Sequence, residues 1–170
     1  MKNIQFQIIG NGQGFQEMKN LAKNLQVTNV NFFGKVPLKM LPELMSEADL
    51  TLGIFGDTEK AKRVVPNKFY SSIAMGKPII NGDSLAIREM PKVEQYTELV
   101  SMADERHIAE SILRLSKDKD ALQYMADHGR MFFEEYLTSQ KLGKKLKEII
   151  EALKNGTIQS VSEAYYMQER

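Results

Sequence analysis

Apolar and polar positions follow two different periods along the first part of the chain. Residues 4–9 alternate and then run apolar, and this run ends in the glycine-rich segment at residues 10–14. Such a pattern predicts a strand that leaves into a tight turn. Helical spacing of three and four positions follows, which predicts a helix after the turn. Its apolar face is expected at Phe15, Met18, Leu21, Ala22 and Leu25.

Strand-like and helix-like segments continue to alternate as far as residue 102. Four further strands are predicted by apolar runs at residues 30–33, 50–55, 78–80 and 98–102. Helices are predicted between them near residues 41–45, 66–74 and 85–90, the second with Pro66 as its first residue and Gly76 as its cap. Beyond these strands the chain is expected to be helical, with Thr138 as an N-cap and apolar stripes at Ile108, Ile112 and Leu115 and at Leu142, Leu146, Ile149 and Leu153.

This order of elements predicts an α/β fold with a mostly parallel, Rossmann-like sheet, helices on both faces and a helical C-terminal region. We expect one domain over residues 1–154 and a poorly patterned tail over residues 155–170. In such sheets the ligand lies beyond the carboxyl ends of the strands. The segments that follow the predicted strands are therefore the places to look for chemistry.

Composition excludes several classes of function. The 170 residues carry 23 basic and 22 acidic side chains, a net charge of +1, so no overall field would recruit nucleic acid. There is no cysteine, which excludes a disulfide framework, and neither His107 nor His128 has a second histidine or cysteine at metal-ligand spacing. No apolar run approaches the roughly 20 residues of a transmembrane helix. We expect a cytoplasmic protein without a metal site or a bound cofactor.

The glycine-rich turn is a candidate phosphate-binding segment. Gly10, Gly12 and Gly14 would let the backbone approach a phosphate closely, and the following helix would offer free N–H groups. A dinucleotide fingerprint is disfavoured, because Phe15 occupies the position of its third glycine and the second strand ends in Phe-Phe-Gly without an acid for ribose. The alternative is a tight turn that binds nothing.

A second candidate is the basic loop before the predicted helix at Pro66. It concentrates Lys60, Lys62 and Arg63, and Asn67 and Lys68 follow directly. Arginine contacts two phosphate oxygens at once and lysine supplies a point charge, so the loop suits a diphosphate leaving group. A solvated basic loop is the alternative.

Several segments together resemble a known family. In order and spacing they are similar to the C-terminal domain of the "glycosyl transferases group 1" family, which has the GT-B fold. The resemblance extends over residues 4–153, and residues 74–78 are its most specific part. The segments that carry it are Ile8-Ile9-Gly10-Asn11-Gly12, Val30-Asn31-Phe32-Phe33-Gly34-Lys35-Val36, Ala48-Asp49-Leu50, Pro66-Asn67-Lys68-Phe69-Tyr70 and Ala74-Met75-Gly76-Lys77-Pro78-Ile79-Ile80.

The resemblance implies a role for several residues. Backbone near Lys35 and Val36 would hold the nucleobase, the Gly12 turn and the helix at residue 66 would hold the diphosphate, and the ribose would lie near Ser71. The family usually has a glutamate followed eight positions later by a second one. Arg63 and Ser71 occupy these positions here, so the ribose contact is reduced to a hydroxyl and Arg63 would add a phosphate contact.

The function that the resemblance implies is the donor-binding half of a retaining glycosyltransferase in polysaccharide biosynthesis. It would take a nucleotide-diphospho-sugar as substrate and transfer the sugar to a glycan or a lipid-linked acceptor. A missing acceptor-binding domain or partner chain would complete the site and bring it to the membrane surface, and the chain alone would be inactive. No catalytic residue is assigned. The alternatives are a non-catalytic nucleotide-binding or assembly module with the same fold and, less favoured, a receiver-like signalling domain.

The resemblance also implies a gap in the sheet. The family's domain begins with a strand and a helix that have no counterpart before residue 4, and that strand is central in the doubly wound order. Residues 5–9 and 51–54 would then be left with unpaired backbone groups, at a cost of about 1 to 3 kcal/mol for each buried group. We expect these two strands to pair directly. The alternative is a strand donated by a partner chain.

Overall fold

The structure is a computed structural model that describes residues 4–158 and residue 160. The strands of this part are β1 (Phe6–Ile9), β2 (Val30–Gly34), β3 (Thr51–Leu52), β4 (Ile79–Gly82) and β5 (Thr97–Val100). The α-helices are α1 (Phe15–Asn24), α2 (Leu41–Ser46), α3 (Glu59–Lys62), α4 (Asn67–Ala74), α5 (Leu85–Arg88), α6 (Glu105–Leu115), α7 (Lys119–Phe132) and α8 (Ser139–Lys154). Shorter helical segments are η1 (Leu38–Met40), η2 (Val93–Gln95) and η3 (Phe133–Leu137). None of the described helices is long and apolar enough to cross a membrane.

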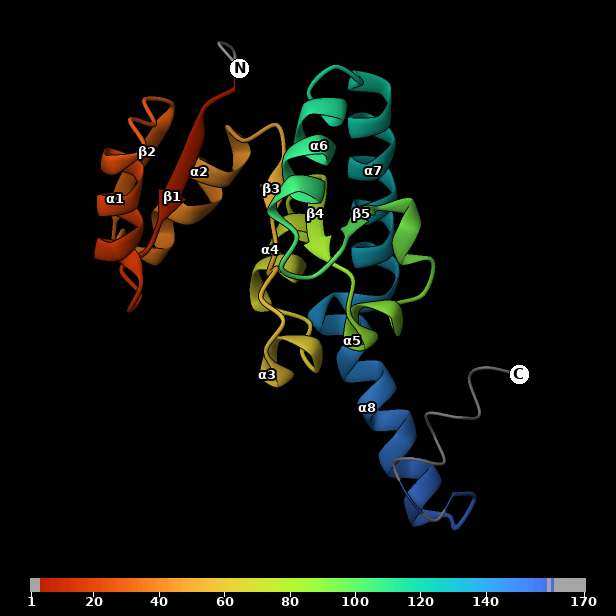
Figure 1. The fold of residues 1–170 in the computed structure, drawn as a ribbon. Coiled ribbons are helices and arrows are strands. Elements are labelled where there is room, and N and C mark those ends of the chain that lie inside the picture. The colour runs from red at the N-terminus through yellow and green to blue at the C-terminus, as the bar shows by residue number, and fades with distance from the viewer. Residues whose placement is uncertain (1–3, 159, 161–170) are drawn as a thin grey trace.

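The strands form two parallel sheets that lie beside each other (Figure 1). In the first sheet β1 pairs with β2, and Phe6 lies opposite Val30. In the second sheet β4 lies between β3 and β5, so that Ile79 has Thr51 on one side and Thr97 on the other. All of these pairs are parallel, as the alternation of strands and helices predicts.

Alternating side chains of β4 fix the layers around the second sheet. Ile79 and Ile80 are both fully buried, but they belong to different clusters because successive side chains of a strand point to opposite faces. Ile79 packs in a cluster with Phe69 of α4, whereas Ile80 packs in a cluster with Ile112 of α6 and Met125 of α7. Helices therefore cover both faces of this sheet, which confirms the predicted fold class.

The predicted elements are largely present, with differences at two ends. The predicted strand at residues 50–55 is reduced to β3. Backbone bonds to β4 continue beyond it but become irregular, because Gly53 donates to Ile80, Gly82 donates to the Ile54 carbonyl oxygen, and the Ile54 N–H donates to the side-chain oxygen of Asn81 at 3.1 Å. Pro66 is the N-cap of α4 rather than its first residue. Gly76 has the positive φ of 61° that its predicted capping position requires. Thr138 caps α8 as predicted, whereas residues 159 and 161–170 of the predicted tail lie outside the described residues.

The direct pairing that we predicted between residues 5–9 and 51–54 is wrong. β1 is paired only with β2, and β3 only with β4. Phe6 from β1 and Leu52 from β3 instead line a slot between the two sheets, together with Ile108 and Ile112 of α6. The Phe6 side chain packs against the cluster that contains Ile80 and Ile112, so side chains rather than backbone hydrogen bonds connect the two sheets here. The gap between the sheets therefore stays open.

Residues 4–50, which contain the first sheet, bury little of their apolar surface. No residue from Ile4 to Leu50 is buried, whereas the second sheet carries a fully buried core. Helix α1 forms as predicted, but Met18, Leu21 and Leu25 of its apolar face remain 45%, 57% and 65% exposed. The first sheet is thus an incompletely covered layer, although its sequence has the apolar pattern of a buried one.

Candidate functional site

A pocket of about 480 Å³ lies at the carboxyl end of β3, where the fold class places ligands. Its wall is the loop from β3 to α4, which contains the short helix α3. The lining combines glycines and apolar side chains with two lysines, and so it has both room and positive charge. The lining residues are Gly53, Ile54, Phe55, Gly56, Thr58, Lys60, Ala61, Val64, Pro66 and Lys68.

The path of the chain into this pocket depends on a close contact between β3 and β4. Asn81 is buried, and its side chain accepts from the Ile54 N–H at 3.1 Å and donates to the Gly82 carbonyl oxygen at 2.8 Å. A side chain at residue 53 would collide with that amide, because a Cβ there would lie 1.9 Å from the Asn81 oxygen. Gly53 is therefore required by this close approach to β4.

The cations of the loop are only partly neutralised. Thr58 caps α3 by accepting from the Ala61 N–H, and Glu59 in the first turn pairs with Lys62 at 3.5 Å and with Arg63 at 3.1 Å. Lys60 lines the pocket and forms no ion pair among the described residues. The Arg63 side chain is 77% exposed, so that it is free to turn toward another anion. The loop therefore has more basic side chains than its single paired acid, Glu59, can neutralise.

Lys68 provides the second cation of the pocket and comes from the first turn of α4. Its ammonium donates to the Gly53 carbonyl oxygen at 3.0 Å, and burial lowers the pKa of Lys68. The N-cap of α4 is Pro66, which has no side-chain hydrogen bond to the first turn, so N–H groups of this helix end remain available. A helix N-terminus beside a lysine is suited to binding a phosphate.

The structure places the predicted site residues in two groups at the same end of the strands (Figure 1). Arg63, Asn67, Lys68 and Ser71 belong to the loop and to α4, although only Lys68 of these lines the pocket. The Ser71 hydroxyl donates to the Asn67 carbonyl oxygen at 3.1 Å. The first group therefore surrounds the start of α4.

The second group lies at the end of the first sheet, on the other side of the gap. Gly10 has a φ of 134° and donates from its N–H to the Gly34 carbonyl oxygen at 2.7 Å, which joins the ends of β1 and β2. Gly12 lies in the turn and Gly14 is the N-cap of α1, and no atom lies within 4 Å of a Cβ at either position. This second group is completed by Lys35 and Val36, which follow β2. None of these residues lines the pocket at Lys68.

Sequence reasoning missed most of the residues that line the pocket. It treated residues 50–55 as a strand, yet the assigned strand ends at Leu52 and residues 53–56 line the pocket. Two glycines at the end of a predicted strand were the available signal for a turn. The contact of Asn81 with Ile54 joins residues distant in sequence, so no local pattern contains it.

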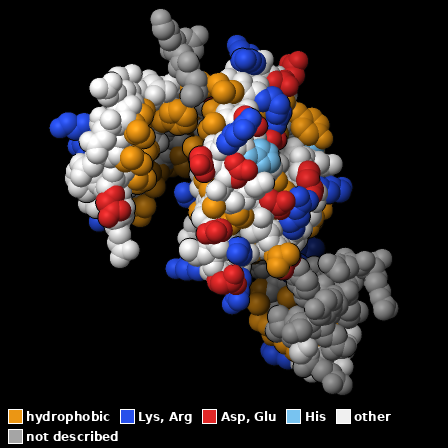
Figure 2. Space-filling view, in the orientation of Figure 1, with side chains coloured by type: hydrophobic (Ala, Val, Ile, Leu, Met, Phe, Trp, Pro, Cys, Tyr) orange, Lys and Arg blue, Asp and Glu red, His pale blue; other side chains and the backbone are white. Residues whose placement is uncertain are grey.

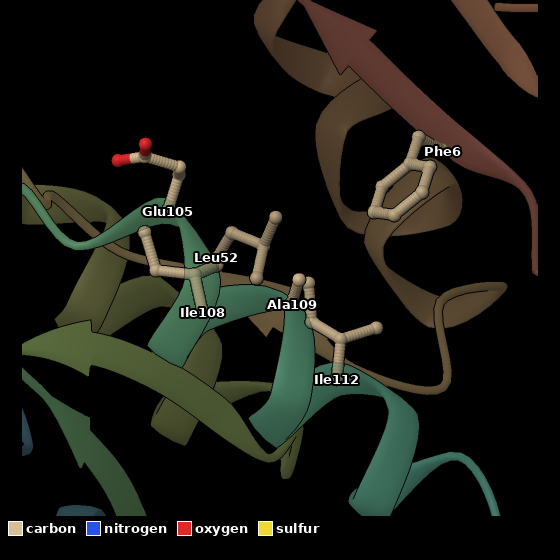
Figure 3. A pocket seen from close by; sticks show the side chains of 6 residues that line it. All are labelled: Phe6, Leu52, Glu105, Ile108, Ala109 and Ile112. Atoms are coloured by element: carbon tan, nitrogen blue, oxygen red, sulfur yellow. The ribbon is translucent and has the colours of Figure 1, made fainter.

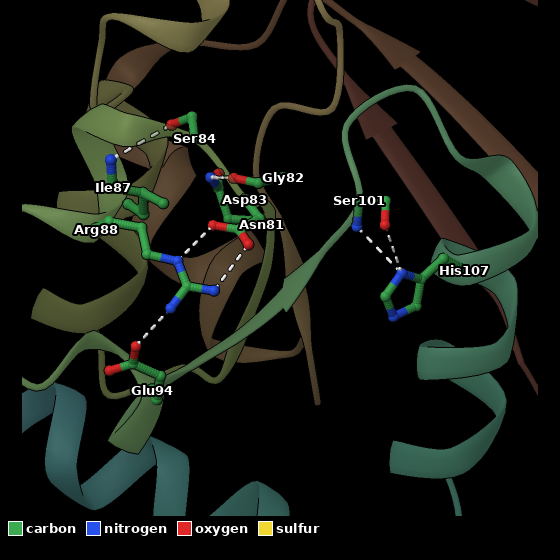
Figure 4. A network of polar contacts seen from close by, with 9 residues as sticks. All are labelled: Asn81, Gly82, Asp83, Ser84, Ile87, Arg88, Glu94, Ser101 and His107. Carbon is green, nitrogen blue, oxygen red and sulfur yellow. Dashed lines mark hydrogen bonds and ion pairs between the residues drawn. The ribbon is translucent and has the colours of Figure 1, made fainter.

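A polar network follows β4 at the same end of the sheet (Figure 4). Arg88 donates to both carboxylate oxygens of Asp83, at 2.7 Å and 2.8 Å, and to Glu94 at 2.9 Å. The hydrogen bonds from Arg88 hold the pKa of Asp83 below its ordinary value. His107 accepts from the Ser101 N–H at 3.1 Å and so has a structural contact. Within the described chain, no cluster of three or more His, Asp or Glu side chains is placed to hold a metal ion.

Solved structures share this architecture. The chain is similar to sucrose-phosphate synthase from Thermosynechococcus elongatus, with a TM-score of 0.74, 16% identity and coverage of 89% of this chain and 39% of that one. It is similar to HepE from Anabaena in complex with UDP-glucose, with a TM-score of 0.75, 16% identity and coverage of 90% of this chain and 42% of that one. It is also similar to a glycosyltransferase from Rickettsia africae, with a TM-score of 0.72, 17% identity and coverage of 90% of this chain and 41% of that one. The fold is that of one half of a GT-B glycosyltransferase.

The family follows from the sequence itself. A model described as "Glycosyl transferases group 1" matches residues 1–118, well over half of the chain. The chain therefore belongs to the glycosyl transferases group 1 family. No curated protein gives a significant match to its sequence. The chain spans about two fifths of the length of the solved structures named above.

Proposed function

We propose that this chain is the donor-binding half of a retaining glycosyltransferase. It holds a nucleotide-diphospho-sugar, and the completed enzyme passes the sugar to a glycan or a lipid-linked acceptor. The pocket at the carboxyl end of β3 carries this proposal, because it joins Lys68 to the open N-terminus of α4. The complex of HepE with UDP-glucose supports the choice of ligand class.

The diphosphate is assigned to the pocket on charge and geometry. Negative charge grows on the leaving diphosphate as the bond to the sugar breaks, and positioned cations stabilise that charge. Lys68 and the first turn of α4 would contact one phosphate group. Arg63 would leave Glu59 and contact another, since its side chain is exposed beside the pocket loop.

The nucleoside is assigned to the second group of residues. Lys35 and Val36 would hold the base, and the turn from Gly10 to Gly14 would contact the diphosphate from the opposite side. Ser71 would contact the ribose through its hydroxyl. A single donor molecule would then bridge the two groups across the gap between the sheets.

Sugar transfer requires an acceptor-binding domain or partner chain. A GT-B site lies between two halves, and the positioning that one half supplies cannot be replaced by the other. We therefore expect binding but no turnover from residues 1–170 alone. The proposed setting is cytoplasmic polysaccharide biosynthesis, with membrane contact made through the acceptor half.

Calorimetric and thermal-shift titration tests the proposal directly. UDP, GDP, ADP and their sugar conjugates are compared, with the nucleoside monophosphates as controls for the second phosphate. A diphosphate present at 100 times its dissociation constant should stabilise the chain by about 2.7 kcal/mol. If no nucleoside diphosphate binds better than its monophosphate, the donor-site proposal is wrong.

The second candidate function is a non-catalytic module with the same fold. The Arg63 guanidinium pairs with Glu59, and the Ser71 hydroxyl donates to the Asn67 carbonyl oxygen. These two positions, where the family usually has glutamates, therefore offer no free carboxylate. This observation favours a module that has given up the family's ribose contact. Affinity for nucleoside diphosphates separates the donor site from an assembly module, because an assembly module has no reason to keep it.

A further inference from the structure

Helix α8 has an exposed apolar stripe, although it lies away from the gap between the sheets. Leu142, Leu146 and Ile150 are 48%, 59% and 43% exposed, and their spacing of four residues places them on one face of the helix. The slot in Figure 3 is also lined by apolar side chains, but the open space between the two sheets accounts for it. Because α8 packs chiefly on η3, its stripe has a different cause.

The start of α8 directs the helix away from the sheets. Thr138 has an extended backbone, with φ of −65° and ψ of 152°, so α8 does not continue the axis of η3. The Thr138 hydroxyl accepts from the Lys141 N–H at 3.4 Å and caps the new helix. Figure 1 shows α8 extending from the rest of the fold, and Figure 2 shows hydrophobic side chains on the visible part of it. The stripe therefore lies on a projecting element rather than inside a cleft.

The charge of α8 differs from that of the rest of the chain. The helix has five lysines and two glutamates, which are Lys141, Lys144, Lys145, Lys147, Lys154, Glu148 and Glu151. The whole chain has 23 basic and 22 acidic residues, so the remainder has two more acids than bases. At about 100° per residue, both glutamates fall on the far side of the helix from the stripe, whereas Lys145 and Lys154 border it. Positive charge therefore flanks the apolar side chains.

We propose that α8 binds the surface of a membrane that contains anionic lipid, with the helix axis parallel to that surface. Leu142, Leu146 and Ile150 would enter the boundary between headgroups and acyl chains, and the flanking lysines would contact lipid phosphates. An apolar stripe between lysines, with the acids on the far side, is typical of a helix that lies in a membrane interface.

The lysines favour a membrane over other occupants of the stripe. A second copy of α8 would bring two lysine-rich faces together, and like charges at short distance are destabilising. The buried centre of a protein interface is depleted of lysine, whereas Lys145 and Lys154 border this stripe. Anionic lipid supplies an apolar layer and negative charge together, so it matches both parts of the pattern.

This contact would belong to the donor-binding half itself. The proposed function places membrane contact in the acceptor half and assigns no role to α8. The inference therefore does not rest on the donor site, and the two can be tested separately on the same chain.

Co-sedimentation of the full chain with lipid vesicles tests the proposal. One set of vesicles is phosphatidylcholine alone, and the other contains phosphatidylglycerol in equal amount. We expect at least about tenfold tighter binding to the mixed vesicles, because an anionic surface attracts nearby lysines. An increase in salt from about 0.1 M to about 1 M should weaken this binding, because the Debye length falls from about 10 Å to about 3 Å.

A pair of double variants tests the apolar stripe. Leu142→Gln with Leu146→Gln removes two exposed side chains of α8 and should weaken binding to the mixed vesicles by about tenfold or more. The matched control is Leu21→Gln with Leu25→Gln, at the same spacing on α1 and its C-cap, where both leucines are also exposed. This control should bind the vesicles as the wild type does.

A second pair of double variants tests the charge. Lys141→Gln with Lys145→Gln should weaken binding to the mixed vesicles by about tenfold and reduce its dependence on salt. Lys19→Gln with Lys23→Gln removes the same charge at the same spacing from α1 and should change binding little.

Several results would overturn the proposal. These are a lack of binding to the mixed vesicles, equal binding to both kinds of vesicle, and binding that the α8 variants leave unchanged. Dimers that form without vesicles and are lost in Leu142→Gln with Leu146→Gln would assign the stripe to a second copy and would also overturn it. Titration of the same variant with UDP should match the wild type, since α8 does not line the pocket at Lys68, so failure of the donor site is seen independently.

Discussion

The ammonium of Lys68 donates to the carbonyl oxygen of Gly53 at 3.0 Å, which ties the first turn of α4 to the end of β3. This bond uses one of the three donors of the lysine and leaves two for a ligand. Lys68 forms no ion pair among the described residues, and burial lowers its pKa. An incoming phosphate would supply the missing counter-charge, so this residue should contribute strongly to the binding of a diphosphate.

The first prediction concerns the two cations assigned to the diphosphate. Arg63→Ala combined with Lys68→Ala should weaken binding of UDP or GDP by at least about tenfold, because each charge-assisted hydrogen bond contributes about 1.5 to 3 kcal/mol. Calorimetry measures the change. Lys117→Ala with Lys119→Ala removes the same charge near the turn between α6 and α7, which lies at the opposite end of the second sheet from α3 in Figure 1, and should leave affinity nearly unchanged. Equal affinities for the two double variants would remove the phosphate role from the loop.

The second prediction concerns the ribose. Ser71→Glu introduces a carboxylate on α4, and a carboxylate accepts a hydroxyl more strongly than serine does. The variant should gain preference for a ribonucleoside diphosphate over its deoxyribose analogue, measured as the ratio of the two dissociation constants. Ser71→Gln keeps the size without the charge and should gain less. If the ratio does not rise in Ser71→Glu, then Ser71 does not face the ribose.

The sequence predicted the fold where the pattern was local. Strands and helices alternate with clear periods, so the parallel sheets and the covering helices could be predicted before the structure was known. The gap between β1 and β3 could not be predicted, because only the tertiary arrangement brings Phe6 and Leu52 to the same slot. Direct pairing was expected from backbone energetics, but Phe6 packs against the cluster that contains Ile112 of α6, and an apolar slot remains between the two strands.

The candidate site, too, could be predicted only where the sequence pattern was local. Lys68 was found from sequence because it follows a proline that marks a helix start, and the structure places it in the pocket. The walls at Gly53 and Gly56 were missed, since a glycine inside an apolar run also fits a strand. Asn81 was outside any local pattern, because its partner Ile54 lies 27 positions away.

The third prediction concerns acid stability and the pair of Asp83 with Arg88. The pKa of Asp83 is lowered in the folded chain, so the pair stabilises the fold above the ordinary aspartate pKa of about 3.9 and loses its effect as pH falls through the lowered value. Arg88→Gln should raise the pKa of Asp83 toward its ordinary value, as followed by NMR titration of the carboxylate. The unfolding free energies of the wild type and this variant should converge at acid pH. A matched control is Arg106→Gln, which removes an exposed pair with Glu110 and should leave Asp83 unchanged.

The last prediction tests the close contact that shapes the pocket. A Cβ at Gly53 would lie 1.9 Å from the side-chain oxygen of Asn81, and Asn81 cannot move away without releasing the Ile54 N–H. Gly53→Ala should therefore lower the unfolding free energy by about 1 to 3 kcal/mol, the usual cost of overpacking. Gly56 lines the same pocket, yet a Cβ there meets no atom within 4 Å, and Gly56→Ala should change stability by less than about 0.5 kcal/mol. Urea denaturation measures the stability of both variants. Equal stabilities would show that Gly53 and Asn81 do not approach each other as closely as the structure places them.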